Sequence, residues 1–216
     1  MPNPSLQTSY TLLGYARLRQ GAGGGLLNTA TTSSVLTLVT LYLQNTLRRS
    51  PLEAAATLLP FSLAVIGGAS QSAALLRRYR PQLVVALGLT GIAAADLALI
   101  PSAAAPLALA ACAAVAGAGI GLSSVATTGL GTDVETYWRG SASGIINTAS
   151  QLGTAIGIAV LLLIAAATTG TPAPGTRAPA IAWTVAAAVA AAGAVFFATA
   201  SQRSGDHPAS GNVGRR

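Results

Sequence analysis

The stretch LALAACAAVAGAGIGLSSVATTGL, from Leu107 to Leu130, contains no charged residue and is the clearest indication of the fold. A helix of roughly 20 apolar residues, rising 1.5 Å per residue, spans a hydrocarbon core about 30 Å thick. Apolar stretches of comparable length lie on both sides of it, separated by short charged clusters. The six predicted spans cover residues 26–47, 54–76, 83–100, 107–130, 141–168 and 178–200.

The composition of the chain agrees with membrane insertion. Charged residues make up 8% of the 216 residues, hydrophobic residues make up 52%, and the mean hydropathy is +0.60. A soluble domain of this size lacks the polar surface needed to cover six apolar helices. The sequence therefore predicts an all-α membrane protein, a bundle of six transmembrane helices.

The arginines predict how the chain is oriented in the membrane. The net charge of +7 does not indicate nucleic-acid binding, because the basic residues are scattered at span boundaries and not gathered on one face. Positively charged loops stay on the cytoplasmic side. We expect a multi-pass cell-membrane protein with both termini cytoplasmic, which places nine arginines inside and three outside. The inner set is Arg17, Arg19, Arg77, Arg78, Arg80, Arg139, Arg203, Arg215 and Arg216, and the outer set is Arg48, Arg49 and Arg177.

The remaining segments predict no further domain, metal site or cofactor. Residues 1–21 form a polar cytoplasmic lead-in that lacks the short apolar region of a signal peptide, and residues 22–200 form the transmembrane domain. Residues 201–216 have the composition of a disordered cytoplasmic tail, and His207 lies there. Cys112 lies among alanines in the fourth span, which favours an inert buried thiol.

The most polar part of the predicted bilayer interior is the first half of the fifth span. Its residues Ser143, Asn147, Gln151 and Thr154 are four, four and three positions apart, so they share one helical stripe. Amides in lipid need hydrogen-bond partners, so the stripe faces the bundle interior or a water-filled cavity. Two interpretations stay open: the stripe lines a cavity, or it holds helices together at about 0.6 kcal/mol per hydrogen-bonded pair.

Two further polar features lie in other spans. The hydroxyls of the first span favour helix–helix hydrogen bonding. Asp96 is the only ionisable side chain well inside a span, which makes it a candidate proton-relay or cation site, although a shallow position near Ile100 would instead keep it hydrated. The polar face of the first span comprises Asn28, Thr31, Thr32, Thr40, Tyr42 and Gln44, with Ser33, Ser34 and Thr37 between them.

Two small-xxx-small motifs predict close helix packing. Gly117 and Gly121 are in the fourth span, and Gly153 and Gly157 are in the fifth. Small residues at this spacing let helix backbones approach one another in membranes. We therefore expect both spans to pack tightly.

Several segments resemble one transporter family. Residues 41–44 (LYLQ), 50–54 (SPLEA) and 59–61 (LPF) resemble the seam between the first two helices in the C-terminal half of fourteen-helix drug:proton antiporters of the major facilitator superfamily. Residues 142–149 (ASGIINTA), followed by QLG at 151–153 and AIG at 155–157, are similar to a later helix of that half. Order and spacing agree across residues 22–200.

The resemblance implies a fold and a function. In that family two six-helix halves enclose a central cavity and expose it alternately to each side, and proton entry drives the export of small hydrophobic or cationic compounds. By this analogy the first, second, fourth and fifth spans line the cavity, while the third and sixth are peripheral. The implied substrate-binding candidates are Asn147, Gln151, Ser143, Tyr42 and Gln44. Asp96 is in the third span, so the analogy counts against a role for it in transport. It remains a candidate for proton coupling only because it is an ionisable residue inside a span.

The sequence also departs from the family pattern. No counterpart of the family's N-terminal half is found in these residues. Ser150 stands where the family usually has Arg. In the basic turn between the second and third spans, residues 77–82, Arg80 and Gln82 replace the usual Gly and Arg. A path formed between two halves cannot be made by one half alone.

Three classes of function follow from these observations. The first is half of an efflux transporter, either truncated or paired with a second six-helix half, which is another copy or a separate chain. The second is a non-transporting membrane scaffold, regulatory subunit or inactive transporter remnant. The third, a membrane enzyme, has no catalytic constellation in the sequence.

Overall fold

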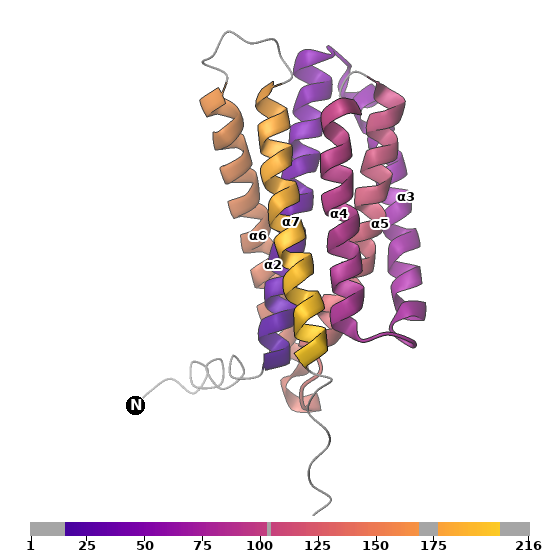
Figure 1. The fold of residues 1–216 in the computed structure, drawn as a ribbon, viewed down its shortest axis with the longest axis vertical. Coiled ribbons are helices and arrows are strands. Elements are labelled where there is room, and N and C mark those ends of the chain that lie inside the picture. Colours follow the sequence, from indigo (N-terminus) through magenta and orange to yellow (C-terminus); the bar gives the residue numbers. More distant parts are fainter. Residues whose placement is uncertain (1–15, 103–104, 169–176, 204–216) are drawn as a thin grey trace, which may run out of the picture.

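A computed structural model describes residues 16–102, 105–168 and 177–203, and these residues form a helical bundle (Figure 1). The described residues contain six helices long and apolar enough to cross a membrane, and no strand. The predicted all-α, six-helix membrane architecture is therefore confirmed. The helices are α2 (Ala16–Leu41) with its π-helical extension η1 (Tyr42–Thr46), α3 (Pro51–Leu75), α4 (Pro81–Ser102), α5 (Pro106–Gly131), α6 (Arg139–Thr168) after the 3-10 turn η2 (Thr136–Trp138), and α7 (Arg177–Arg203).

The observed helix limits differ from the predicted spans mainly at the first helix. The other five helices begin and end within three residues of the predicted limits. The first is already helical at Ala16, because Gly21, Gly24 and Gly25 pack closely against neighbouring residues instead of breaking the helix. A side chain at Gly21 would meet the α5 backbone, and one at Gly25 would lie 2.7 Å from the Ser150 hydroxyl of α6. Residues 1–15, 103–104, 169–176 and 204–216 lie outside the described residues.

The start of α3 is set by local sequence. Ser50 is its N-cap: the Ser50 hydroxyl accepts a hydrogen bond from the Glu53 backbone N–H at 3.3 Å, and the Glu53 carboxylate accepts one from the Ser50 N–H at 2.9 Å. This reciprocal capping box satisfies backbone donors that have no partner inside the helix. Pro51 occupies the first turn, where its missing N–H costs nothing.

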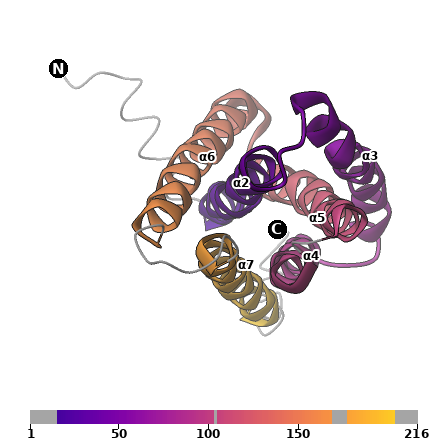
Figure 2. The ribbon, with the colours of Figure 1, turned by 90° about the horizontal axis from the view of Figure 1, so that it is seen from above.

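The six helices form two layers with one open face. Figure 2 shows α2 and α5 at the centre, α6 beside α2, α3 beside α5, and α4 with α7 on the opposite side. The helices α3 and α6 are the least buried, with 11% and 17% of their most apolar windows buried, against 44% or more in the other four. We call the side of the bundle that lies between α3 and α6 the open face.

Glycines bring the central helix α5 close to its neighbours. Gly117 and Gly121 lie against backbone carbonyl oxygens of α3, and Gly119 lies against Gly88 of α4. On α6, Gly153 lies against a backbone carbonyl oxygen of α2. The predicted tight packing of both small-xxx-small helices is confirmed at these positions.

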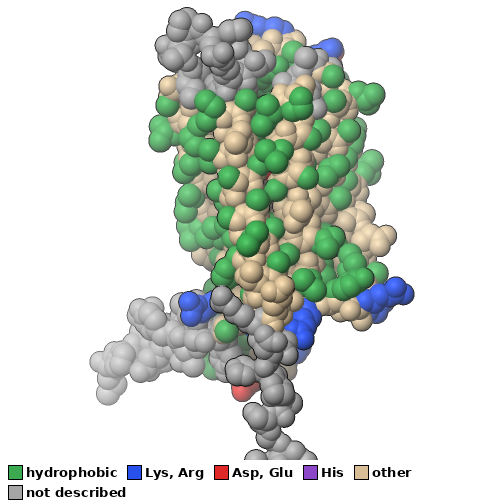
Figure 3. Space-filling model, in the orientation of Figure 1, with side chains coloured by type: hydrophobic (Ala, Val, Ile, Leu, Met, Phe, Trp, Pro, Cys, Tyr) green, Lys and Arg blue, Asp and Glu red, His purple; other side chains and the backbone are tan. Residues whose placement is uncertain are grey.

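The surface of the bundle is apolar between two charged ends. Figure 3 shows hydrophobic side chains along the length of the bundle, with arginines near its two ends. The end at which α2 begins carries Arg17, Arg19, the 77–80 turn and Arg139, and the other end carries Arg48 and Arg49. Such a belt of apolar side chains matches the hydrocarbon core of a bilayer.

Candidate functional site

The helix α6 presents two different exposed surfaces. Its buried face packs on α2 and the neighbouring core. Because an α-helix advances 100° per residue, the exposed polar and exposed apolar residues fall on opposite sides of that buried face. The buried residues are Ala142, Ile146, Gly153 and Leu161, the main polar set is Ser143, Asn147 and Gln151, and the main apolar set is Leu152, Ile156 and Leu163. Ser141 and Thr148 are also exposed and lie between these two sets, and the Thr148 hydroxyl donates to the Gly144 carbonyl oxygen of its own helix at 2.9 Å. We call the main polar set the polar flank and the main apolar set the apolar flank.

The amides of the polar flank take no part in holding the bundle together. Within the part of the chain that the structure describes, neither Asn147 nor Gln151 makes a side-chain hydrogen bond, and both residues are exposed. Each amide carries two donors and an acceptor, which are costly to place in lipid without partners. Of the two interpretations left open by the sequence, the geometry favours contact with water, substrate or another chain. Thr154, at the end of the stripe, is half-buried.

The first span, by contrast, uses its polar residues for packing. Asn28 is buried, its Nδ2 donates to Ser124 Oγ at 2.8 Å, and its Oδ1 accepts from Ser123 Oγ at 2.9 Å. The Thr29 hydroxyl donates to the Ser150 carbonyl oxygen of α6 at 2.6 Å. Among the residues of the predicted polar face, helix–helix hydrogen bonding is confirmed at Asn28, and Thr29, which that face did not include, makes a further interhelical bond. Other hydroxyls donate to carbonyls of their own helix, namely those of Thr31, Thr37 and Thr40.

The other two predicted substrate-binding residues lie far from the polar flank. Tyr42 is buried in an apolar cluster, where its ring meets Trp183 edge-on with centroids 6.1 Å apart. Tyr42 follows Thr29 by 13 residues, so the two lie roughly 20 Å apart along the helix axis. Because Thr29 contacts Ser150 of α6, Tyr42 is about that far from the level of Ser150 as well. Gln44 is half-buried in η1. The structure thus groups Ser143, Asn147 and Gln151, and does not bring Tyr42 or Gln44 beside them.

Asp96 lies inside the protein and not at a hydrated interface. Its side chain is fully buried, and neither carboxylate oxygen has a hydrogen-bond partner among the described residues. The helices α4 and α7 run in opposite directions, and Leu89 lies beside Gly193. Two turns further along α4, Asp96 therefore lies level with Ala186 of α7, one turn from Trp183.

Trp183 is a residue that the sequence analysis missed. It is fully buried, and among the described residues its indole Nε1 has no partner. The available signal was a single tryptophan in an alanine-rich span, since a buried indole N–H usually finds a hydrogen-bond partner.

The comparisons with known proteins identify the family. The family model of the Major Facilitator Superfamily matches residues 2–158, which include α2 to α5 and the polar flank of α6. No curated protein matches the chain. With its six membrane-spanning helices, the chain is a multi-pass membrane protein. It belongs to the Major Facilitator Superfamily, a family of membrane transporters.

Proposed function

We propose that this chain is one six-helix half of a proton-coupled efflux transporter for small hydrophobic or cationic compounds, of the fourteen-helix drug:proton antiporter type. The observation that carries the proposal is the polar flank of α6. Three polar side chains, two of them amides without partners in the described bundle, stand exposed on α6, beside the face that packs on α2 and opposite its exposed apolar flank. Such a surface needs an aqueous cavity beside it.

A second six-helix half completes that cavity. The weak burial of α3 and α6 leaves both sides of the open face available for another bundle. The second half is another copy of this chain or a separate chain, and the cavity forms between the two bundles. The apolar flank of α6 then contacts lipid, and the polar flank faces the cavity.

The proposed substrate path runs along the open face. Ser143, Asn147 and Gln151 contact the substrate through amide and hydroxyl groups, and the apolar parts of a drug-sized compound pack on the surrounding side chains. Gln44, half-buried in η1, is proposed to act at the other end of the same path, roughly 20 Å away along the bundle. Tyr42 is enclosed in the core beside Trp183 and contacts no substrate in this arrangement.

Asp96 is proposed to carry the coupled proton. A buried carboxylate without hydrogen-bond partners is costly in its charged form, so its charge state is tied to its surroundings. A change in the packing of α4 against α7 that admits water to Asp96 would allow the proton to leave. Transport and proton movement would then share one conformational step.

Proton-driven accumulation in inverted membrane vesicles tests the substrate path. With a fluorescent organic cation as substrate, Asn147→Ala and Gln151→Ala should change the order of preference among several cations, and Ile156→Ala on the apolar flank should not. The proposal fails if all three variants behave alike, or if the chain transports nothing with itself or a candidate partner while it folds normally.

Replacing Asp96 separates proton coupling from transport. Asp96→Asn keeps the shape of the side chain and removes its titration. The variant should lose accumulation driven by a proton gradient and keep downhill exchange of the labelled cation. Unchanged proton-driven accumulation would exclude Asp96 as the coupling group.

The proposed orientation places both termini in the cytoplasm. It rests on the excess of arginines at the end where α2 begins. Arg78→Cys and Arg49→Cys should then react with a membrane-impermeant maleimide from opposite sides, Arg49→Cys from outside. Labelling of Arg78→Cys in intact cells would reverse the orientation.

A further inference from the structure

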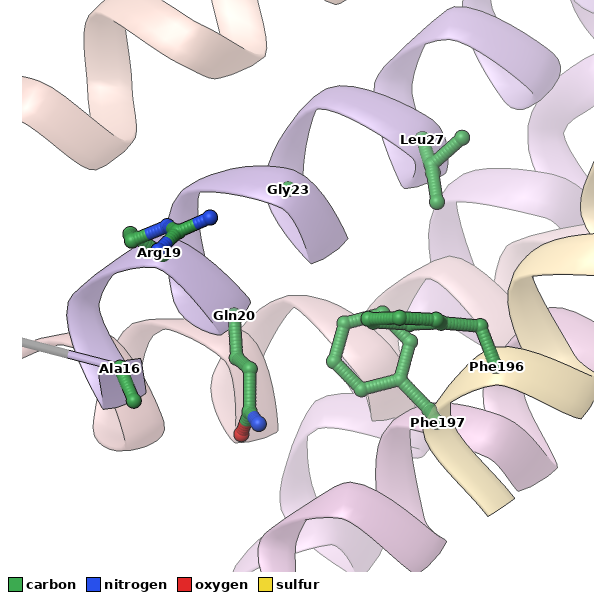
Figure 4. A pocket seen from close by; sticks show the side chains of 7 residues that line it. All are labelled: Ala16, Arg19, Gln20, Gly23, Leu27, Phe196 and Phe197. Atoms are coloured by element: carbon green, nitrogen blue, oxygen red, sulfur yellow. The ribbon is translucent and has the colours of Figure 1, made fainter. Parts of the chain in front are cut away.

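A groove between α2 and α7 lies apart from the open face. It has a volume of about 320 Å³ and is lined by Ala16, Arg19, Gln20, Gly23, Leu27, Phe196 and Phe197. Figure 4 shows the α2 residues on one side and the two phenylalanines of α7 on the other. The groove lies where α2 begins and α7 ends, which is the end of the bundle that carries most of the arginines in the described residues.

The mouth of the groove is basic and polar. Arg19 is exposed, and among the described residues no carboxylate pairs with it, whereas its neighbour Arg17 pairs with Asp133. Gln20 lies next to it, and its amide oxygen accepts a hydrogen bond from Gln82 Nε2 at 3.3 Å. This bond positions the Gln20 side chain by its oxygen, so the Gln20 amide N–H groups remain available to donate to a ligand. Arg19 and Gln20 together therefore favour an anion.

The wall of the groove is apolar. Phe197 is fully buried and fixed between the helices, while Phe196 beside it is 56% exposed. Their rings meet edge-on, with centroids 5.4 Å apart. Leu27 of α2, half-buried, continues this apolar surface toward the middle of the bundle. From the end of the bundle toward its middle the groove thus changes from basic to apolar, just as a bilayer changes from its charged surface to its hydrocarbon core.

The space beside α2 depends on a glycine. Gly23 lines the groove, and a Cβ atom placed there would meet nothing within 4 Å. The other glycines of this segment that the structure describes, such as Gly21 and Gly24, are closely packed. Gly23 therefore does not serve the helix packing, and its effect is to leave the groove open.

We propose that this groove binds one anionic phospholipid, with the phosphate at Arg19 and Gln20 and the start of an acyl chain along Leu27 and Phe196. The match of charge and polarity carries the assignment: basic pockets between transmembrane helices suit lipid head groups. The volume is at the small end of the range of roughly 300–1,000 Å³ for ligand sites, so the rest of the lipid remains in the bilayer. This site is independent of the proposed transport function, because it needs only the fold and the membrane.

Native mass spectrometry of the full chain in detergent tests the proposal. The chain is titrated with phosphatidylglycerol, or with phosphatidylcholine of the same acyl chains, and the first bound lipid is quantified. One phosphatidylglycerol should bind more tightly than phosphatidylcholine. Arg19→Gln should weaken it about fivefold, the value of one arginine beside an anionic lipid. Gly23→Leu should fill the groove and reduce phosphatidylglycerol binding to the phosphatidylcholine level.

Two matched variants serve as controls. Gly67→Leu, on α3, adds the same side chain at another position where a Cβ meets nothing within 4 Å. Arg78→Gln removes an exposed arginine outside the groove. Both should bind phosphatidylglycerol like the wild type, and circular dichroism should show equal helix content throughout. The proposal is overturned if Arg19→Gln and Gly23→Leu bind like these controls, if phosphatidylcholine binds equally well, or if inorganic phosphate displaces the lipid at equal concentration.

Discussion

Replacing Asn28 by alanine tests how polar groups hold the bundle together. The change removes two interhelical hydrogen bonds, one to Ser124 at 2.8 Å and one from Ser123 at 2.9 Å. At about 0.6 kcal/mol for each bond within a membrane bundle, their loss costs about 1.2 kcal/mol. Ser123 keeps a second acceptor, the Gly119 carbonyl oxygen of its own helix at 2.8 Å, so its hydroxyl is not left without a partner. We therefore expect the free energy of unfolding to fall by about 1–2 kcal/mol, including the small cavity left by the amide.

Equilibrium unfolding in mixed micelles, followed by circular dichroism, measures this effect. The matched control is Asn147→Ala, which removes the same amide from the polar flank, where the described bundle offers it no partner. Its cost should stay within about 0.5 kcal/mol, as for other surface substitutions. A double-mutant cycle of Asn28→Ala with Ser124→Ala should give a coupling energy near 0.6 kcal/mol. Equal costs at Asn28 and Asn147, or a coupling energy of zero, would refute the distinction between packing amides and cavity amides.

Two further pairs of substitutions test the packing of the bundle by the same unfolding measurement. Gly153→Val places a side chain against a backbone carbonyl of α2 and should cost about 1–3 kcal/mol, whereas Gly144→Val, which faces open space, should not destabilise through a clash. Phe197→Ala empties a fully buried position and should cost about 3–5 kcal/mol, and Phe196→Ala beside it, at 56% exposure, should cost much less. Reversal of either order would contradict the observed packing.

The membrane architecture was predictable because it depends on composition over long stretches. A span such as 107–130 has no charge, it directly follows Pro106, which begins the helix, and it ends three residues before Asp133. The start of α2 was not predictable in this way. Five residues rich in glycine normally weaken a helix, and here close approach to α5 and α6 outweighs that preference.

The candidate site was predictable only in part. The spacing of Ser143, Asn147 and Gln151 fixes a shared stripe, but not whether another helix covers it, because periodicity along one helix carries no information about its neighbours. The same limit applies to Tyr42, whose ring is enclosed by residues far away in the sequence, Trp183 among them. Its burial depends on how α7 is placed against η1.

The crowding around α5 restricts where this chain can change during evolution. Gly117, Gly119 and Gly121 meet backbone atoms of α3 and α4, and the Asn28 hydrogen bonds occupy a third side, so these positions of α5 leave no room for a larger residue. Inherited substitutions should then accumulate at exposed positions, which are most frequent on the outer helices α3 and α6 and can be exchanged without disturbing the centre. Lineages of this protein should diverge at the rim of the bundle while its middle stays constant.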